Sequence, residues 1–474
     1  MDRRKFLTAS AASAGVAMFG GPFAGVAAAG ERGTLTHGAD YGPLGPVPDL
    51  RDGVVRLQLP AGFTYRSFNP VGEAFTEGGL TPGRHDGMAA FRGPKGSTIL
   101  VRNHEVNGPV GAFGDVSHAY DTAAGGGTAT LRVTRYGELI KSAASLNGTQ
   151  MNCSGGPMPW GAWVTCEETV NGPDVGNDFT GADNTLLKQK HGYIFEVPLD
   201  RAAGRRPIRS AGRFAHESAA FDPRTGAIYL TEDNFGFASG FYRYLPPKNP
   251  LKAGRILDGG KLQMLAVKNA PGKDLSVGLP AGASFQATWV TIDDPDPTFT
   301  TKPTNDEAIQ YVGKQGRAKG AALFSRLEGA VYDSGTIYFV STQGGATAAG
   351  DTPPSGFGKG RGQIFAYDTW SDRLRLVYES PGSLVLDLPD NVTTSKRGTL
   401  VLCEDGGGDN YLRGLTRRGE IFDFSRLMPV SGDSGAEFAG STFGPDGHTL
   451  FVNVQSSQGV SFAIWGPWHK GGFY

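Results

Sequence analysis

The sequence predicts an all-β protein, and three observations lead to this fold class. Glycine supplies 72 of the 474 residues and proline another 30, which provides turn-forming residues throughout the chain. Hydrophobic residues make up 39% of the chain, including 28 phenylalanines and 15 tyrosines, so a large core can be buried. The strict three-residue period of collagen is not present. The third observation is a repeat of strand-like hairpins, described below.

The charge balance gives no reason to expect a partner that is held by charge alone. The chain has 45 basic and 46 acidic residues, for a net charge of -1. This balance does not suggest binding to nucleic acid or to an acidic membrane surface. The sequence also lacks a heptad pattern, and we expect a monomer.

Residues 1–29 are expected to be an export signal. Two arginines at 3–4 precede Phe6-Leu7, a weakly apolar stretch over 9–26 and three alanines at 27–29. This order is typical of a twin-arginine signal with a small-residue cleavage site. We therefore expect export by the twin-arginine machinery to the periplasm or the medium. The stretch is too weakly apolar to remain as an anchor, so the mature chain is expected to have no membrane span.

The cysteines exclude a disulfide framework. Only Cys153, Cys166 and Cys403 are present, so at most one pair could form. At least one thiol stays free in an oxidising compartment, and its presence there needs another reason.

Six segments share one layout, which is a polar start, an apolar run, a turn, a second apolar run and a polar end. In chain order they start at Asp86, Cys153, Glu217, Glu328, Asp390 and Glu437. Their second runs end at Glu105, Glu168, Asp233, Gln343, Asp405 and Gln455. Turn residues lie between the two runs, as at Pro94-Lys95-Gly96. Each segment is therefore a predicted β-hairpin, and further strand-like sequence follows it.

A strand-rich unit that recurs six times indicates a six-bladed β-propeller, here one domain over residues 30–474. One interval between units is longer than the others. It contains a proline- and glycine-rich stretch at about 245–320, which we expect to be an insertion with extra strands. A pair of β-sandwiches is the alternative fold, but it does not explain the repeated polar ends.

The polar ends predict a metal site at one mouth of the central channel. The start and the end of a hairpin lie at the same edge, so six inner hairpins would gather their acids around one mouth. Many carboxylates can share such a place only if cations bind or if solvent separates them. Oxygen ligands suit calcium, and a thiolate at Cys153 suits a transition metal such as iron. The simpler alternative is that the acids cap strand ends and accept hydrogen bonds from turn amides.

One motif, Asn152-Cys153-Ser154-Gly155-Gly156, opens a segment that continues to Glu168. This segment is the most specific part of a resemblance to a known family, the PhoX alkaline phosphatases. Five other segments share the resemblance, as does the twin-arginine signal: 103–105, 213–217, 229–234, 326–329 and 438–447. The resemblance extends from about Asp86 to Trp468.

The resemblance implies a six-bladed propeller that holds a mixed iron and calcium cluster and hydrolyses phosphomonoesters outside the cytoplasm at alkaline pH. By motif position, Cys153, Glu168 and Glu217 would be iron ligands. Glu105, Glu328 and Glu404 would be calcium or bridging ligands. Arg326 would hold the phosphate, with Asn103 as a second contact. This chain is shorter than the family members considered, which leaves its substrate range open.

The chemistry of these residues agrees with phosphate-ester hydrolysis. Metals neutralise phosphate oxygens and activate water, and an arginine can bind two phosphate oxygens at once. Arg326 could instead form an ordinary salt bridge to Glu328. Two other functions stay open: a propeller hydrolase of the lactonase or calcium-phytase type, and a non-catalytic binding propeller with structural metals. The thiol of Cys153 favours the phosphatase, because calcium-only sites do not use sulfur.

Overall fold

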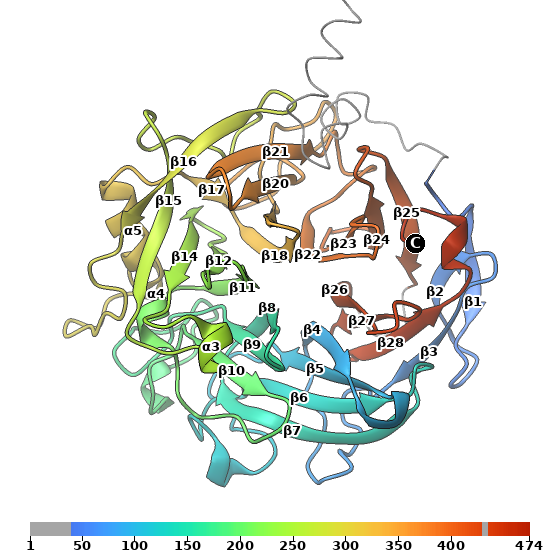
Figure 1. Cartoon of the computed structure of the whole chain (residues 1–474). Helices are drawn as coiled ribbons and strands as arrows, with labels where there is room; N and C mark the ends of the chain where they lie inside the picture. Colours follow the sequence, from blue (N-terminus) through green and yellow to red (C-terminus); the bar gives the residue numbers. More distant parts are fainter. Residues whose placement is uncertain (1–38, 429–434) are drawn as a thin grey trace, which may run out of the picture.

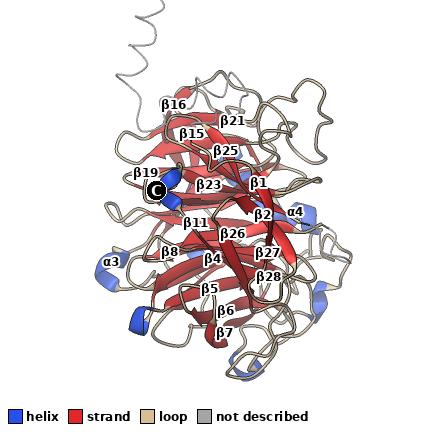
Figure 2. Ribbon diagram, turned by 90° about the vertical axis from the view of Figure 1, so that its right-hand side faces the viewer, coloured by secondary structure: helices blue, strands red, loops and turns tan. Residues whose placement is uncertain are grey.

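The computed structural model describes residues 39–428 and 435–474, so the expected export signal lies outside the described residues. Strands dominate the described part, and its α-helices are short: α3 (Pro250–Ala253), α4 (Asn305–Ile309) and α5 (Tyr311–Ala318). Figure 2 shows the helices at the periphery of the stacked strands. None of these helices has the length and hydropathy that crossing a bilayer requires. The all-β fold class is confirmed.

Six inner strands surround a central channel (Figure 1). They are β4 (His85–Arg92), β8 (Asn152–Met158), β11 (His216–Phe221), β18 (Leu327–Asp333), β22 (Pro389–Thr394) and β26 (Glu437–Phe443). Each inner strand contacts the next one, and β26 contacts β4 to complete the ring. These strands begin the six predicted hairpins, so the prediction of a six-bladed propeller is confirmed.

The blades are antiparallel sheets that run outward from these strands. The first blade continues with β5 (Thr98–His104), β6 (Gly126–Val133) and β7 (Leu139–Thr149). The second has only β9 (Ala162–Glu167) and β10 (Ile194–Pro198) outside β8. The other outer strands are β12 (Ile228–Glu232), β14 (Phe241–Leu245) and β15 (Lys261–Val267) in the third blade; β19 (Thr336–Ser341), β20 (Gln363–Asp368) and β21 (Arg373–Glu379) in the fourth; and β23 (Leu400–Glu404), β24 (Tyr411–Leu415) and β25 (Ile421–Leu427) in the fifth.

The sixth blade closes the ring with strands from both ends of the described chain. After β26 come β27 (Leu450–Gln455) and β28 (Val460–Trp465), and β28 pairs with β3 (Thr64–Phe68). Two further strands, β1 (Leu44–Pro48) and β2 (Val55–Pro60), extend the fifth blade through β25. Because β3 comes from the N-terminal part of the described chain, its backbone hydrogen bonds to β28 join the two ends of that chain within one blade.

The segment at about 245–320 combines a blade strand with extra structure. It contains β15, the outer strand of the third blade, and β16 (Ser284–Thr291). β16 pairs with β15 on one side and with β21 on the other, so it joins the third and fourth blades. α4 and α5 follow. Two short strands flank this segment in the sequence, β13 (Ala238–Ser239) before it and β17 (Phe324–Ser325) after it. They pair with each other in a small sheet.

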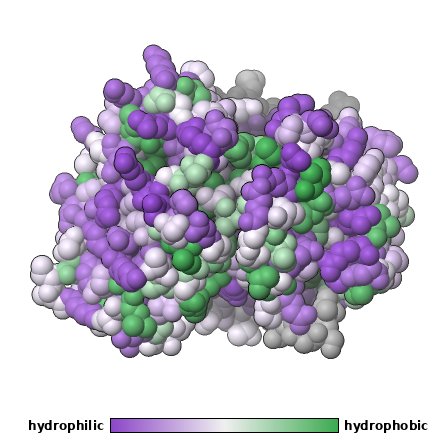
Figure 3. Space-filling view, turned by 90° about the horizontal axis from the view of Figure 1, so that it is seen from below, coloured by the Kyte–Doolittle hydropathy of each residue, from purple (hydrophilic) through white to green (hydrophobic). Residues whose placement is uncertain are grey.

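Aromatic side chains fill the spaces between neighbouring blades. Between the third and fourth blades, Phe241 stacks on Phe339 with ring centroids 4.2 Å apart, and Phe339 stacks on Phe365. All three are fully buried. Burying one such side chain contributes about 1.5–3 kcal/mol. On the face of the molecule that Figure 3 shows, hydrophilic side chains are interspersed with small apolar groups. The core therefore lies between the blades and leaves the channel mouth for polar groups.

Candidate active site

A β-bulge in each inner strand positions the residues of the channel mouth. In β4, His85 pairs with His104 and Met88 pairs with Arg102. Two residues of β4, Asp86 and Gly87, therefore lie opposite the single residue Asn103 of β5. The same shift occurs in the other five inner strands. The bulged pairs are Asp86-Gly87, Cys153-Ser154, Glu217-Ser218, Glu328-Gly329, Asp390-Asn391 and Gly440-Ser441. A bulge interrupts the regular alternation of side chains and can aim one of them in a new direction.

The first residue of the bulge lines a common cavity of about 670 Å³ in five of the six blades. In the sixth blade this position is Gly440, and the acid that reaches the cavity is Glu437. The lining contains ten carboxylates, which are Asp86, Glu105, Glu168, Glu217, Asp233, Asp306, Glu328, Asp390, Asp405 and Glu437. Only two guanidinium groups, Arg84 and Arg326, face them in this lining. The cavity therefore has a large excess of negative charge.

Burial and mutual repulsion disturb the ionisation of these acids. Desolvation, followed by the charge of neighbouring carboxylates, raises the pKa of Asp86 and Glu217 well above the usual carboxyl range. The same causes raise the pKa of Asp390 to about 7. Burial also raises the pKa of the Cys153 thiol. Bound cations would favour the charged forms of all these groups, because they supply the missing positive charge.

Two groups of side chains have the donor atoms and spacing of metal sites. The ligand atoms of Cys153, Glu168 and Glu217 lie within 4.8 Å of one another. Those of Glu217, Glu328 and Asp390 also lie within 4.8 Å of one another. Glu217 belongs to both groups, and its Oε1 atom is buried without a hydrogen-bond partner among the described residues. A sulfur–carboxylate set beside an all-carboxylate set fits a transition metal next to a hard cation.

Arg326 is held at the edge of these groups by two acids. Its Nη2 atom donates to Asp233 at 2.7 Å and to Glu328 at 2.8 Å, and its Nε also donates to Asp233. Arg326 has a φ of 42°, a left-handed conformation that is uncommon for a non-glycine residue. The salt bridge between Arg326 and Glu328, which the sequence left open as an alternative, is present in the structure. It fixes the guanidinium at the edge of the cavity. Nη1 takes part in neither of these ion pairs.

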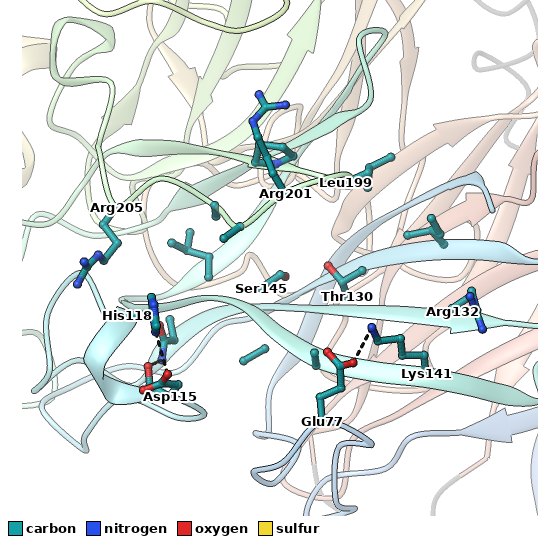
Figure 4. A pocket seen from close by; sticks show the side chains of 18 of the residues that line it. Glu77, Asp115, His118, Thr130, Arg132, Lys141, Ser145, Leu199, Arg201 and Arg205 are labelled. Carbon is teal, nitrogen blue, oxygen red and sulfur yellow. Dashed lines mark hydrogen bonds and ion pairs between the residues drawn. The ribbon is translucent and has the colours of Figure 1, made fainter. Parts of the chain in front are cut away.

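A second cavity, of about 650 Å³, lies on the outside of the first two blades and has a different character (Figure 4). Its lining includes Arg132 and Arg205, but several of its charges are neutralised locally. Lys141 pairs with Glu77 at 2.5 Å, and His118 pairs with Asp115 at 2.8 Å. This pocket has no crowded acids to hold a cation, so the channel mouth is the better candidate for the active site.

Comparison with known proteins identifies the family. The family model described as alkaline phosphatase PhoX matches residues 39–144 and 137–458. The chain belongs to the PhoX family. It is therefore a hydrolase of the alkaline phosphatase type, and the resemblance of the sequence motifs is confirmed. Comparison with curated proteins gives no match.

One solved structure shows the same fold for this PhoX-family chain, and others are less similar. Pseudomonas fluorescens PhoX, solved with vanadate as a transition state analogue, has a TM-score of 0.64 and 18% identity, with 92% of this chain and 98% of that chain covered. A gluconolactonase from Xanthomonas campestris has a TM-score of 0.38 and 14% identity, covering 92% and 100% of the two chains. The calcium-binding protein regucalcin from Agrobacterium tumefaciens has a TM-score of 0.37 and 10% identity, covering 85% and 96%.

The structure brings most of the predicted site residues together. Cys153, Glu168, Glu217, Glu105 and Glu328 all line the cavity, and so does Arg326. Metal dependence, which belongs to the PhoX family, fits this arrangement. The hairpin pattern placed Asp390 at the mouth without a ligand role, although the structure puts it in the second ligand group. No motif in the sequence pointed to Arg84, which pairs with Glu105 at 2.8 Å.

Glu404 does not reach the cavity, contrary to its expected ligand role. Its carboxylate accepts hydrogen bonds from the backbone N–H groups of Asp387 and Tyr411 and from the Nε of Arg413. Glu404 is fully buried inside the blade, and the next residue, Asp405, lines the cavity instead. Consecutive residues at a strand end point in opposite directions, so only one of the two can face the channel.

Asn103 is also placed differently from the expected phosphate contact. Its Nδ2 donates to the backbone oxygens of Cys153 and Ser154, and its Oδ1 accepts from Trp163 and Thr165. Asn103 is fully buried and does not line the cavity. Its amide holds the bulge that carries Cys153, so it positions the thiol.

Proposed function

We propose that this chain is an extracytoplasmic phosphomonoesterase that uses iron and calcium at the mouth of its propeller. The observation that carries the proposal is the pair of adjacent ligand groups that share Glu217. One contains the only thiol in the cavity lining, Cys153, and the other contains carboxylates alone. Arg326 lies beside them with its guanidinium fixed by Asp233 and Glu328.

The donor types suggest which residues would hold which metal. Cys153, Glu168 and Glu217 would hold iron, because a thiolate suits a transition metal. Glu328 and Asp390 would hold calcium together with Glu217, and Glu105 is a further carboxylate in the lining. When bound, such metals neutralise the charge of phosphate oxygens and lower the pKa of an attacking water.

The chain's own residues bind and orient the ester. The guanidinium of Arg326 would donate to phosphate oxygens, and two fixed acids keep it from rotating away. Asn103 keeps the Cys153 bulge in place through two hydrogen bonds to its backbone. A small phosphate ester would fit, because the cavity has a volume of about 670 Å³ and two of its lining residues, Phe179 and Phe235, are exposed to solvent.

Metal analysis combined with activity tests the proposal. The purified chain is expected to contain iron and calcium and to hydrolyse 4-nitrophenyl phosphate at alkaline pH, and a chelator is expected to abolish the activity. The Cys153→Ser variant should lose iron and most activity, whereas Cys403→Ser, at a buried cysteine outside the cavity lining, should retain both. Calcium alone, with a fully active Cys153→Ser variant, would contradict the iron assignment. Tight metal binding without turnover of any phosphoester would favour a non-catalytic propeller.

Export is proposed from the sequence alone. The arginine pair at 3–4 supports the twin-arginine route, which carries proteins that are already folded. Replacing both arginines with lysine should keep active enzyme in the cytoplasmic fraction. Unchanged export of that variant would contradict the route.

A further inference from the structure

Apolar side chains also line one part of the acidic cavity. Phe179, Phe235, Phe237 and Ile309 are part of its lining, together with the acids described above. None of the four lies in an inner hairpin. Phe179 belongs to the segment between β9 and β10, Phe235 and Phe237 follow β12, and Ile309 lies in α4. We call these four residues the apolar rim.

Two members of the apolar rim are exposed to an extent that is unusual for phenylalanine. Phe179 is 68% exposed and Phe235 is 54% exposed, whereas the bulge acids Asp86, Glu217 and Glu328 are buried. These bulge acids are therefore deeper in the cavity than the two aromatic rings, which reach the solvent. Exposed aromatic rings beside a polar cavity are typical of a surface that becomes covered when a ligand binds.

The position of Phe235 relative to Arg326 links the apolar rim to the phosphate. The guanidinium carbon of Arg326 lies 5.6 Å from the centroid of the Phe235 ring. A phosphate that accepts hydrogen bonds from Arg326 would therefore lie near the Phe235 ring, and the organic group of its ester could contact that ring. A hydrogen bond holds the backbone that carries this ring, because Phe357 N–H donates to Phe235 C=O at 2.7 Å.

We propose that the apolar rim binds the organic group of the substrate and selects phosphomonoesters of apolar alcohols, above all those that carry an aromatic ring. This inference rests on the proposed function. The phosphate would bind at Arg326 and at the metals that the cavity acids hold. The organic group would cover Phe179 and Phe235. Esters of small polar alcohols would bind through the phosphate alone and gain nothing from the rim.

Two esters of primary alcohols test this selection: benzyl phosphate and glycerol 3-phosphate. The measured quantity is the ratio of their kcat/KM values, so that differences in phosphate chemistry largely cancel. We expect the native chain to favour benzyl phosphate. The ratio should fall by about threefold to tenfold in Phe179→Ser and in Phe235→Ser, since an aromatic contact contributes on this scale. The control is Leu384→Ser, at a residue that is 90% exposed and lies outside the cavity lining; it should leave the ratio unchanged.

The outcomes separate the rim from the activity itself. A ratio that is the same in the native chain and in both phenylalanine variants would overturn the inference while leaving the phosphatase intact. Equal losses for both esters would also overturn it, because they would show that the rings only support Arg326. If the native chain hydrolyses neither ester, the proposed function fails. The inference is then decided by calorimetric binding of benzylphosphonate and methylphosphonate to the native chain and to Phe235→Ser. A benzyl preference that Phe235→Ser removes supports it, and equal affinities overturn it.

Discussion

In the proposed function, Arg326 is the side chain that would bind the phosphate most directly. Asp233 and Glu328 hold its planar guanidinium, and a lysine could keep the charge but not the fork of donors. We expect Arg326→Lys to lower kcat/KM for 4-nitrophenyl phosphate by about 100-fold, the scale of losing an oriented donor to the transition state. The matched control is Arg201→Lys, at a surface arginine paired only with Asp200 among the described residues. A variant within threefold of the native chain would show that Arg326 is a structural ion pair.

Glu404 and Asp405 are neighbours in the chain, but the structure gives them different environments. Glu404 anchors Arg413 inside the blade, and Asp405 lines the cavity. We expect Glu404→Gln to lower the free energy of unfolding by about 2 kcal/mol, since it weakens a buried charge-assisted hydrogen bond. Its metal content should be retained. Asp405→Asn should instead lower the metal content. Thermal unfolding and metal analysis of both variants check this, and the reverse pattern would show that Glu404 is the ligand.

His191 makes the stability depend on pH. Burial lowers its pKa, but Glu167 at 2.6 Å and Asp121 at 3.5 Å outweigh burial and raise the pKa to about 9. The ordinary value is 6.5, so protonation of His191 favours the folded state. This contribution, about 3 kcal/mol, is complete below pH 6.5 and is lost as the pH rises through 9.

The comparison with His191→Gln isolates this effect. The difference in melting temperature between the native chain and the variant should be large at pH 6.5 and should shrink toward pH 9.5. The exposed His118, which is paired with Asp115, provides the control His118→Gln, whose difference should stay small throughout. A difference for His191→Gln that does not change with pH would mean that His191 is neutral in the folded state.

At the scale of the strands, the bulges require small residues where the inner strands approach each other. A Cβ atom on Gly329 would lie 2.6 Å from the backbone nitrogen of Val392 and 2.8 Å from Asn391 Cα. These are backbone atoms of β22, so they cannot rotate away, and β18 and β22 would have to separate. The bulge that carries Glu328 would move with them.

We therefore expect Gly329→Ala to destabilise the chain by about 1–3 kcal/mol and to lower its metal content. Gly45 in β1 has no atom within 4 Å of an added Cβ, so Gly45→Ala is the matched control and should change neither property. Calorimetric unfolding and metal analysis measure both effects. A Gly329→Ala variant with native stability and metal content would show that the two strands can separate without cost.

The strand pattern was predictable, but the bulges were not. Alternating apolar residues and turn glycines located the hairpins, and β4 and β5 lie where the first of them was expected. A strict alternation of side chains cannot say which of two neighbouring polar residues faces the channel. That choice depends on the extra residue in the bulge, which exists only when the two strands are paired.

In the whole molecule, the six blades bring nine carboxylates into one cavity, and α4 adds Asp306. Without bound cations the acids repel one another, so removal of metal should destabilise the folded chain. We expect a chelator to lower the melting temperature, and excess calcium to restore it, because a ligand at 1,000 times its dissociation constant stabilises by about 4 kcal/mol per site. Sodium chloride at equal ionic strength is the control and should not restore it. An unchanged melting temperature would mean that the acids are neutral in the folded chain, so that the chain needs no metal for its stability.

The all-β class, the six hairpins and the acids at their ends follow from the order of residues in the chain. These features rest on turn residues and on a period of two, which are properties of neighbouring residues in the chain. Only the tertiary structure decided that Asp405 faces the cavity while Glu404 anchors Arg413, and that Asn103 holds the Cys153 bulge. Tertiary pairing also joins β3 to β28 and brings Phe179 and Phe235 to one rim. The physical reason is that these placements depend on contacts between segments far apart in sequence, and local preferences carry no information about such contacts.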